Sequence, residues 1–406
     1  MKKTDSQQQN KKHHSLTIFA ALLAMIGPFS IDTYLPSFPE IETTFAISRS
    51  ILSQSMGIYL LAFAFSTLIW GPLSDKLGRR LVIQISLLIY ILASAACALA
   101  DNFHFFVFMR FIQGLSASGG FIAGRAMIRD AHDADSAHHA MSQVTMLFVI
   151  APAIAPLLGG WLQDQFGWRS IFWFLCIFAL VLILLGRFIE ESLEQKYRQS
   201  LSPTTVIINY TRTFKHKQFM KLVFSLSFSF AGLFIYIVGS PTIIYDFLNL
   251  GSDKFSLQYI PMVGGMMTGA FISAQLAKRW QIQKTTNVGF SIMLSAISIN
   301  LIFVNFFPAS PFYIIFPMVV YALGLSIVLP AVTILALDCF PHHRGLAASA
   351  LGFVQMLINT CVASIIIPLI HNQWLHYVFG QILFLLLGLL LWYQFIVNKG
   401  VNFRPD

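Results

Sequence analysis

Long apolar runs, separated by short polar segments, dominate this chain. Each run contains about twenty mostly apolar residues, which is the length that a helix needs to cross a lipid bilayer. Because the bilayer core offers the backbone no hydrogen-bonding partners, each run is expected to be a helix. Twelve spans are predicted, near residues 16–37, 51–73, 81–100, 103–125, 140–161, 168–189, 219–241, 256–277, 286–306, 311–335, 345–370 and 375–397.

The basic residues between the runs indicate how the chain is oriented. If the amino terminus lies in the cytoplasm, nearly all of the 26 Lys and Arg residues fall in cytoplasmic segments. Only Arg49, Arg169 and Lys254 then lie outside, and Arg110 lies within a span. This asymmetry follows the positive-inside rule, so both termini are predicted to be cytoplasmic. It also supports the count of twelve, because one missing span would scramble the alternation.

The polar interval 190–218 is the longest in the chain and divides the spans into six plus six. A short repeat crosses this divide, since Gly114-Leu115-Ser116 recurs as Gly324-Leu325-Ser326 in the equivalent span. The pattern predicts an all-α integral membrane protein with two pseudo-symmetric six-helix halves and a site between them near mid-membrane. The predicted parts are a cytoplasmic tail (1–15), the first half (16–189), a cytoplasmic linker (190–218), the second half (219–397) and a second cytoplasmic tail (398–406).

Composition agrees with a membrane protein and excludes other classes. Hydrophobic residues make up 56% of the chain and charged residues 11%, whereas a soluble domain carries about 25% charged residues. The net charge of +9 does not indicate nucleic-acid binding, because the basic residues lie between apolar runs rather than on one folded surface. The four cysteines have no spacing typical of metal or disulfide pairs. We therefore expect no nucleic-acid partner, no metal and no cofactor.

Asp32 is the only carboxylate well inside a predicted span of the first half, and Arg110 lies within the fourth span. Asp32 is in the outer half of the first span, and Arg110 enters the fourth span from the outside. A helix rise of about 1.5 Å per residue places their depths within about 5 Å of each other. Charges at such depth usually face a cavity or a partner, so we hypothesise that Asp32 and Arg110 share a polar network that couples to protons. The alternatives are that Asp32 reaches interfacial water and that Arg110 clamps backbone carbonyl groups.

The segment between the second and third spans, residues 71–80, contains the most specific motif. It reads Gly-Pro-Leu-Ser-Asp-Lys-Leu-Gly-Arg-Arg, and its glycines and proline favour a tight turn between adjacent helices. Asp75 is expected at a helix N-terminus, where negative charge is favoured, and the arginines are expected to pair with carboxylates such as Asp130. A phosphate-binding loop is a poor alternative, because no strand precedes the segment and the glycine spacing is wrong. The motif residues with expected roles are Gly71, Asp75, Gly78, Arg79 and Arg80.

The fifth span contains a second motif rich in proline and glycine. Residues 151–160 read Ala-Pro-Ala-Ile-Ala-Pro-Leu-Leu-Gly-Gly. Pro152 and Pro156 are expected to kink the helix. The paired Gly159 and Gly160 are expected to let a neighbouring helix approach closely.

Taken together, these motifs resemble those of the major facilitator superfamily. The segment 71–80 is similar to the superfamily signature between helices 2 and 3. The run from Arg110 to Gly114 resembles the helix 4 motif associated with proton coupling. Residues 155–160 resemble the helix 5 antiporter motif, although Ala155 replaces its first glycine.

The first span narrows the resemblance to one branch of the superfamily. Residues 32–36 resemble the helix 1 signature of the twelve-span drug:proton antiporters, and residues 31–39 with 151–160 are most similar to the Bcr/CflA subfamily. The likeness covers nearly the whole chain but is strong only in the first half. It implies a rocker-switch fold and proton-driven export of drugs, dipeptides or siderophore-like metabolites across a bacterial inner membrane, without a cofactor. We expect Tyr34, Gln113 and Tyr236 to line the substrate cavity.

Other functions remain open at this stage. An uptake symporter or facilitator of the same fold is the main alternative. An integral-membrane enzyme would need catalytic residues that converge in one site, and the acidic and histidine cluster after the fourth span is more typical of a solvated loop. The cluster comprises Asp130, His132, Asp133, Asp135, His138 and His139.

One chain supplies both halves, so a monomer would suffice.

Overall fold

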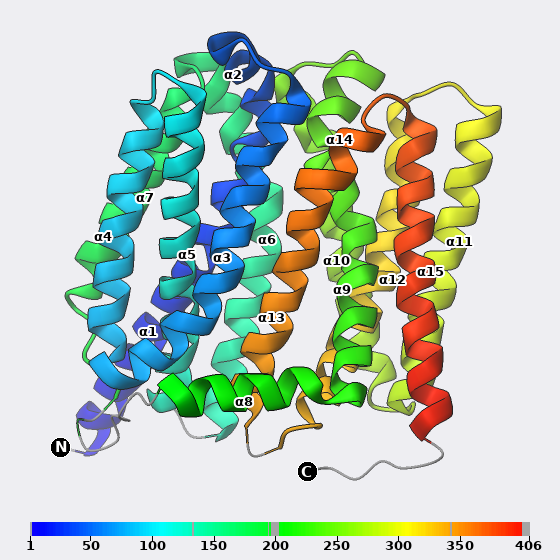
Figure 1. The fold of residues 1–406 in the computed structure, drawn as a ribbon. Coiled ribbons are helices and arrows are strands. Elements are labelled where there is room, and N and C mark those ends of the chain that lie inside the picture. The colour runs from blue at the N-terminus through cyan, green and yellow to red at the C-terminus, as the bar shows by residue number, and fades with distance from the viewer. Residues whose placement is uncertain (1, 132–133, 194, 196–202, 342, 400–406) are drawn as a thin grey trace. The chain divides into compact units, whose positions relative to one another are not determined.

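The computed structural model describes residues 2–131, 134–193, 195, 203–341 and 343–399 (Figure 1). In this part of the chain the regular structure is helical, and no strand is found. The helices group into two compact units, which are described separately. Unit 1 comprises residues 1–45 and 61–203, and unit 2 comprises residues 46–60 and 204–406.

The helices of unit 1 follow the first six predicted spans. A short helical segment continues the first of them, since α1 is followed closely by η1 and α2. The elements are α1 (Lys2–Asp32), η1 (Leu35–Ser37), α2 (Phe38–Phe45), α3 (Arg49–Leu77), α4 (Arg79–Ala98), α5 (Phe103–Ala131), α6 (Ala134–Phe166) and α7 (Arg169–Gly186).

Unit 2 begins in the predicted linker, which contains a helix of its own, α8 (Pro203–Lys215). Two later helices each contain or adjoin a π-helical segment, η3 and η5. The remaining elements are α9 (Lys217–Val238), η3 (Thr242–Phe247), η4 (Ser252–Lys254), α10 (Phe255–Leu276), α11 (Ile282–Phe306), α12 (Pro311–Leu337), α13 (Arg344–Cys361), η5 (Val362–Ile366), α14 (Ile367–Ile370) and α15 (Trp374–Lys399).

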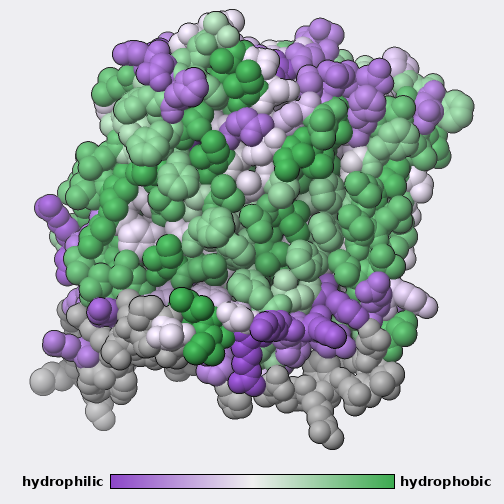
Figure 2. Space-filling model, viewed as in Figure 1, coloured by the Kyte–Doolittle hydropathy of each residue, from purple (hydrophilic) through white to green (hydrophobic). Residues whose placement is uncertain are grey.

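Eleven helices among the described residues are long and apolar enough to cross a membrane. The predicted span 256–277 is also helical, as α10, and its 22 residues would extend about 33 Å. Its glutamines, glycines and tyrosine make it less apolar, so it is not among the eleven. On the face shown in Figure 2, hydrophobic side chains cover the middle of the helices and hydrophilic ones gather near the helix ends.

Several helices extend beyond the apolar run that predicted them. Helix α3 continues to Leu77 and α5 to Ala131, beyond the predicted span ends at 73 and 125. The reason is that hydropathy marks where lipid contact ends, whereas Ala, Met and Arg continue to favour the helix. Hydrophobic runs therefore locate the spans better than the helix ends.

Close packing inside each unit depends on small residues. In unit 1, Gly120 and Gly124 of α5 lie directly against Leu23 of α1, so an added Cβ at either position would come within 3.1 Å of that side chain. In unit 2, Gly324 of α12 lies against the backbone of Gly289 in α11. Such contacts bring helix backbones together where the two apolar surfaces alone would not.

The first turns of α3 are grouped with unit 2, while the rest of this helix is part of unit 1. Arg49 forms an ion pair with Asp246 in η3, and it also donates a hydrogen bond of 3.5 Å to the Thr242 hydroxyl. Further along, the Gln54 amide donates to the Ser364 carbonyl oxygen at 2.8 Å. Polar contacts thus attach the start of α3 to unit 2.

Candidate transport site

A buried arginine organises the polar interior of unit 1. Arg110 in α5 is 0% exposed. Its guanidinium donates to the Gln113 side-chain oxygen and, at 3.2 Å, to the Ser30 carbonyl oxygen in α1. The Gln113 amide in turn donates to the Ser94 hydroxyl in α4 at 2.7 Å. One charge thereby connects three helices.

Asp32 lies close to this network but does not join it. The side chain is 4% exposed, and no hydrogen bond or ion pair to its carboxyl group is found among the described residues. Arg110 contacts residues on either side, through the Ser30 carbonyl group and the Tyr34 ring, whose centroid is 5.0 Å from the guanidinium carbon. The Ser30 contact is of the kind that we considered as an alternative, in which Arg110 clamps backbone.

The three residues expected at the substrate cavity are all buried within their own units. Tyr34 packs against Phe38 and Phe106 at ring-centroid distances of 4.9 Å and 6.1 Å. Gln113 is held in the Arg110 network, and Tyr236 lies inside unit 2. Their contact with substrate stays a prediction.

Tyr236 belongs to an uncharged polar cluster in unit 2. The Asn300 amide donates to the Tyr236 hydroxyl at 2.6 Å and to the Gln381 side-chain oxygen at 3.1 Å. The Gln258 amide donates to the Tyr236 carbonyl oxygen at 2.8 Å. The helix of unit 2 that corresponds to α5 carries Val320 at the position matching Arg110. Among the described residues the buried charges therefore lie in unit 1, and the polar cluster of unit 2 is built from amide and hydroxyl groups.

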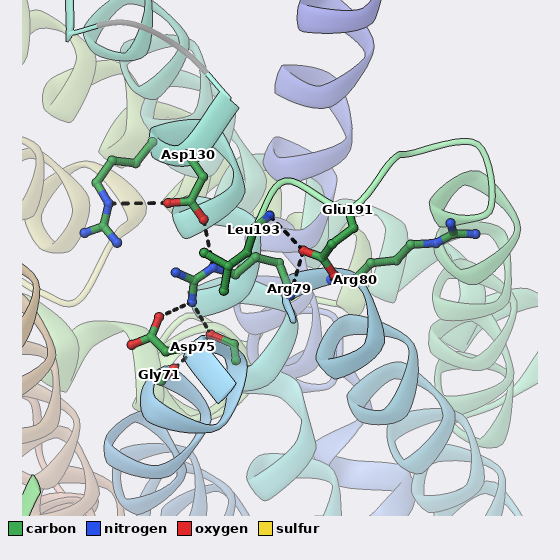
Figure 3. A network of polar contacts seen from close by, with 9 residues as sticks. Gly71, Asp75, Arg79, Arg80, Asp130, Glu191 and Leu193 are labelled. Carbon is green, nitrogen blue, oxygen red and sulfur yellow. Dashed lines mark hydrogen bonds and ion pairs between the residues drawn. The ribbon is translucent and has the colours of Figure 1, made fainter. Parts of the chain in front are cut away.

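The motif between α3 and α4 forms a network of ion pairs and hydrogen bonds around Arg79 (Figure 3). Arg79 pairs with Asp75, and its Nε atom lies 2.9 Å from the Asp130 carboxylate in α5. It also donates to the Ser74 hydroxyl at 2.6 Å. The predicted pairing with Asp130 is thus observed. Because Arg79 is buried, its charge depends on these acceptors.

The turn between α3 and α4 is shorter than expected, and Asp75 lies near the C-terminal end of α3 rather than at a helix N-terminus. Helix α3 continues to Leu77 and α4 starts at Arg79, so Gly78 alone breaks the helix, with φ of 101°. Glycine adopts this positive φ without the steric cost that a Cβ would bring. Asp75 therefore lies in the last turn of α3, and its expected place at a helix N-terminus was wrong.

A residue that the sequence reasoning missed occupies that place. The Glu191 carboxylate accepts hydrogen bonds from the backbone N–H groups of Arg79 and Arg80, at 3.0 Å and 3.1 Å. It therefore caps the first turn of α4, where a negative charge also interacts favourably with the helix dipole (Figure 3). The Arg80 guanidinium also donates a hydrogen bond of 3.1 Å to the carbonyl oxygen of Arg187, the residue that follows α7. The only signal in the sequence was an acidic pair directly after the sixth span.

The glycine of the fifth-span motif packs onto the end of α1. In α6, which contains Pro152 and Pro156, Gly159 lies so close to α1 that an added Cβ would be 2.0 Å from the Thr33 carbonyl oxygen. Thr33 directly follows Asp32. The motif thereby brings the α6 backbone against the segment that carries the buried carboxyl group.

Metal-binding side chains do not cluster in the described part of the chain, where no group of three or more His, Cys, Asp or Glu residues could hold an ion. Most of the acidic and histidine cluster after the fourth span lies outside the described residues, since positions 132 and 133 and the side chains up to 139 are not placed. Asp130 is the member that the structure places, and it binds Arg79.

The whole pattern of helices and motifs can be compared with known families. Residues 20–368 match the Major Facilitator Superfamily. The chain belongs to this superfamily. It is therefore a multi-pass membrane transporter and not an enzyme.

Relatives within the superfamily cover most of the chain. The uncharacterised MFS-type transporter YdgK of Bacillus subtilis is 28% identical over 360 residues, which are 88% of this chain and 89% of the relative. A bicyclomycin resistance protein homolog of Haemophilus influenzae is 24% identical, covering 88% and 90%. Multidrug resistance protein D of Escherichia coli is also 24% identical, covering 88% and 89%.

The fold is also found among solved structures. The crystal structure of a D-xylose-proton symporter superposes with a TM-score of 0.73 and covers 93% of this chain and 97% of its own. Its sequence identity is 17%, so the likeness concerns the fold alone. This all-helical superfamily fold is the one that the motifs predicted.

Proposed function

We propose that this transporter is a proton-coupled antiporter that exports small organic molecules across a bacterial inner membrane by alternating access. Drugs are the first substrate class to consider, because a relative is called a bicyclomycin resistance protein homolog and another a multidrug resistance protein. An endogenous siderophore or dipeptide is the second. The proposed topology has twelve spans, with α10 as one of them and both termini cytoplasmic.

The observation that carries the proposal is the environment of Asp32. It is the one acidic residue that is buried among those the structure describes. An ionised carboxylate held away from water without a partner is costly, whereas a protonated carboxyl group is not charged. Binding and release of a proton therefore change the energy of this site more than that of an exposed acid.

The surroundings of Asp32 suggest how the proton could be exchanged for substrate. Arg110 donates its hydrogen bonds to Gln113 and to the Ser30 carbonyl group. The carboxyl group of Asp32 can therefore bind a proton or a polar group of the solute. If the two compete for Asp32, inward flow of protons drives outward movement of solute. A ligand shifts a conformational equilibrium only by its differential affinity for the two states, and a proton on a buried carboxyl group supplies such a difference.

The test uses everted membrane vesicles that contain the unchanged chain, Asp32→Asn or Asp101→Asn. The last variant makes the same substitution at an exposed acid between α4 and α5. A compound to which expression confers resistance, bicyclomycin being the first to try, is added with an imposed pH gradient. The unchanged chain and Asp101→Asn should accumulate the compound, and Asp32→Asn should not.

Four results would count against the proposal. Accumulation by Asp32→Asn at the unchanged rate would remove Asp32 from the coupling. Uptake in the direction of the proton gradient would indicate a symporter, and transport that ignores the gradient would indicate a facilitator. A labelled carboxyl terminus found on the periplasmic side would contradict the topology.

A further inference from the structure

Helix α8 has two chemically different faces. Its inner face packs on the spanning helices of unit 2, since Thr213 is buried and the Phe214 ring lies 5.7 Å from that of Phe353 in α13. Tyr210 stacks on Phe214 one turn away. Residues three and four apart share a helix face, so Ile208, Thr211, Arg212 and Lys215 lie on the opposite face, and Ile207 lies at its edge.

The outer face combines apolar and basic side chains. Ile207 and Ile208 are 64% and 61% exposed. One turn further along, Arg212 and Lys215 are also exposed. An open cleft of about 510 Å³ lies along this face, and it is lined by Ile207, Ile208, Thr211, Arg212, Lys215 and His216.

Two cations, Arg212 and Lys215, are among the residues that line the cleft. No acidic residue occurs in the sequence between Glu194 and Asp246, so the segment that contains these residues is basic. His216 accepts the Phe219 backbone N–H through Nδ1, at 3.1 Å. A neutral imidazole that accepts through one nitrogen has its proton on the other. His216 can therefore donate through Nε2.

The position of α8 places this cleft at the edge of the membrane. Only His216 separates α8 from α9, a spanning helix that begins at Lys217. The His216 ring also lies 5.0 Å from Phe340, in the connection between α12 and α13. In Figure 1, α8 lies crosswise to α9, the helix that follows it, rather than along it. Figure 2 shows hydrophobic and hydrophilic side chains next to one another along the same edge.

We infer that this cleft is a binding site for an anionic phospholipid of the leaflet on which α8 lies. Arg212, Lys215 and His216 bind the headgroup phosphate, and Ile207 and Ile208 contact the upper part of an acyl chain. Basic side chains at a membrane surface attract anionic lipids, and an amphipathic helix in the interface buries its apolar residues among acyl chains. The inference does not depend on what the transporter carries.

An anionic lipid can contact both the basic and the apolar side chains of this face, whereas the other ligands considered contact only one of the two kinds. A free phosphate ion would satisfy the basic residues but leave Ile207 and Ile208 in water. A zwitterionic lipid would cover the isoleucines but gain little from the cations. The basic residues in the last turn also offset the helix dipole, but a dipole effect alone would not make binding depend on the lipid headgroup.

The experiment measures which lipids the purified full-length chain retains. The protein is incubated in mixed micelles with equal amounts of dioleoyl phosphatidylglycerol and dioleoyl phosphatidylcholine, and bound lipids are counted by native mass spectrometry. The variants are R212A/K215A, the charge-conserving R212K/K215R and a matched control, K278A/R279A, which removes two exposed basic residues between α10 and α11. Gel filtration verifies that each variant remains folded.

We expect the unchanged chain to be enriched in phosphatidylglycerol over phosphatidylcholine. The enrichment should fall roughly fivefold for each basic residue removed from the cleft, and it should be retained by R212K/K215R and by K278A/R279A. If R212A/K215A does not fold, raising the salt concentration on the unchanged chain should lower the enrichment, because exposed charges are screened.

Four outcomes would overturn the inference. Equal retention of the two lipids by the unchanged chain would show that no anionic site exists. An equal loss of phosphatidylglycerol enrichment in K278A/R279A and R212A/K215A would show that any basic residues at this surface have the same effect. Complete displacement of the lipid by inorganic phosphate would assign the cleft to a small anion, and displacement by an acidic peptide would assign it to a protein partner.

Discussion

The guanidinium group of Arg110 donates a hydrogen bond of 3.2 Å to the backbone carbonyl oxygen of Ser30, two residues before Asp32 in α1. A fully buried charge of α5 thus holds the segment of α1 that carries the buried carboxyl group, but it does so through the backbone. The hydrogen bond from Arg110 therefore fixes the backbone beside Asp32 and does not involve the Asp32 carboxyl group. Binding of protons and solute at the carboxyl group is the part that we propose.

Replacing Arg110 by Lys tests the clamp. Lysine keeps the charge but lacks the planar pair of donors, so the bonds to Gln113 and Ser30 cannot both be kept in the same geometry. We expect a loss of about 1.5–3 kcal/mol of stability, measured as a lower thermal midpoint of the purified protein. Arg129→Lys, an exposed position on the same helix, should leave the midpoint unchanged. Equal midpoints for the two variants would argue against the clamp.

The contact between α6 and α1 predicts a strong effect of a single methyl group. Gly159→Ala places a Cβ 2.0 Å from the Thr33 carbonyl oxygen, a clash that either separates the helices or moves the residue next to Asp32. We expect transport to fall at least tenfold. Gly352→Ala makes the same change where no atom lies within 4 Å, and it should transport normally. Initial rates in vesicles at matched protein levels provide the measurement, and an active Gly159→Ala would contradict the predicted contact.

Glu191 should protect the backbone N–H groups at the start of α4 from hydrogen exchange. Removing its carboxylate in Glu191→Ala leaves the N–H groups of Arg79 and Arg80 without their acceptor, which should cost about 1–2 kcal/mol. Hydrogen exchange in a peptide that covers the first turn of α4 should become faster. The neighbouring Glu190→Ala, at an exposed position, should not change it. Faster exchange in both variants, or in neither, would refute the capping role.

The ion pair between Arg49 and Asp246 can be tested by exchanging its charges. Asp246→Arg places two cations together, so we expect a loss of stability of about 1 kcal/mol, because Asp246 is half exposed and the pair is partly screened. The double variant Arg49→Asp/Asp246→Arg should recover most of the loss. A double-mutant cycle of thermal midpoints measures the coupling. Additive effects of the two substitutions would mean that the residues do not interact.

Parts of the candidate site could be predicted because they are local in the sequence. Asp75, Gly78 and Arg79 lie within five positions of one another, so helix geometry alone brings Asp75 and Arg79 together once the chain is helical. Pairing of Arg79 with Asp130, which lies 51 residues away, was expected for another reason, namely that the arginines of the motif need carboxylates as partners. The helix end at Asp75 was misjudged, since glycine and proline were read as a longer turn than the chain makes.

Other contacts carried no comparable signal. Glu191 reaches α4 across more than one hundred residues, and an acidic pair in a polar linker looks like any solvated segment. Arg110 was expected to face Asp32 because both lie at similar depth. Depth along the membrane normal, however, says nothing about rotation around each helix axis. The rotation of α1 and α5 is decided by close packing, as at Gly120 and Gly124 against Leu23.

The sequence by itself therefore determined the membrane class, the spans and the superfamily motifs of this chain. These depend on hydropathy over about twenty consecutive residues and on residues a few positions apart, which require no knowledge of neighbours. Only the tertiary structure decided that Arg110 binds the Ser30 backbone, that Glu191 caps α4 and that Arg49 pairs with Asp246. Such contacts depend on how helices from distant parts of the chain are rotated and packed, and packing is a property of the whole fold rather than of any one segment.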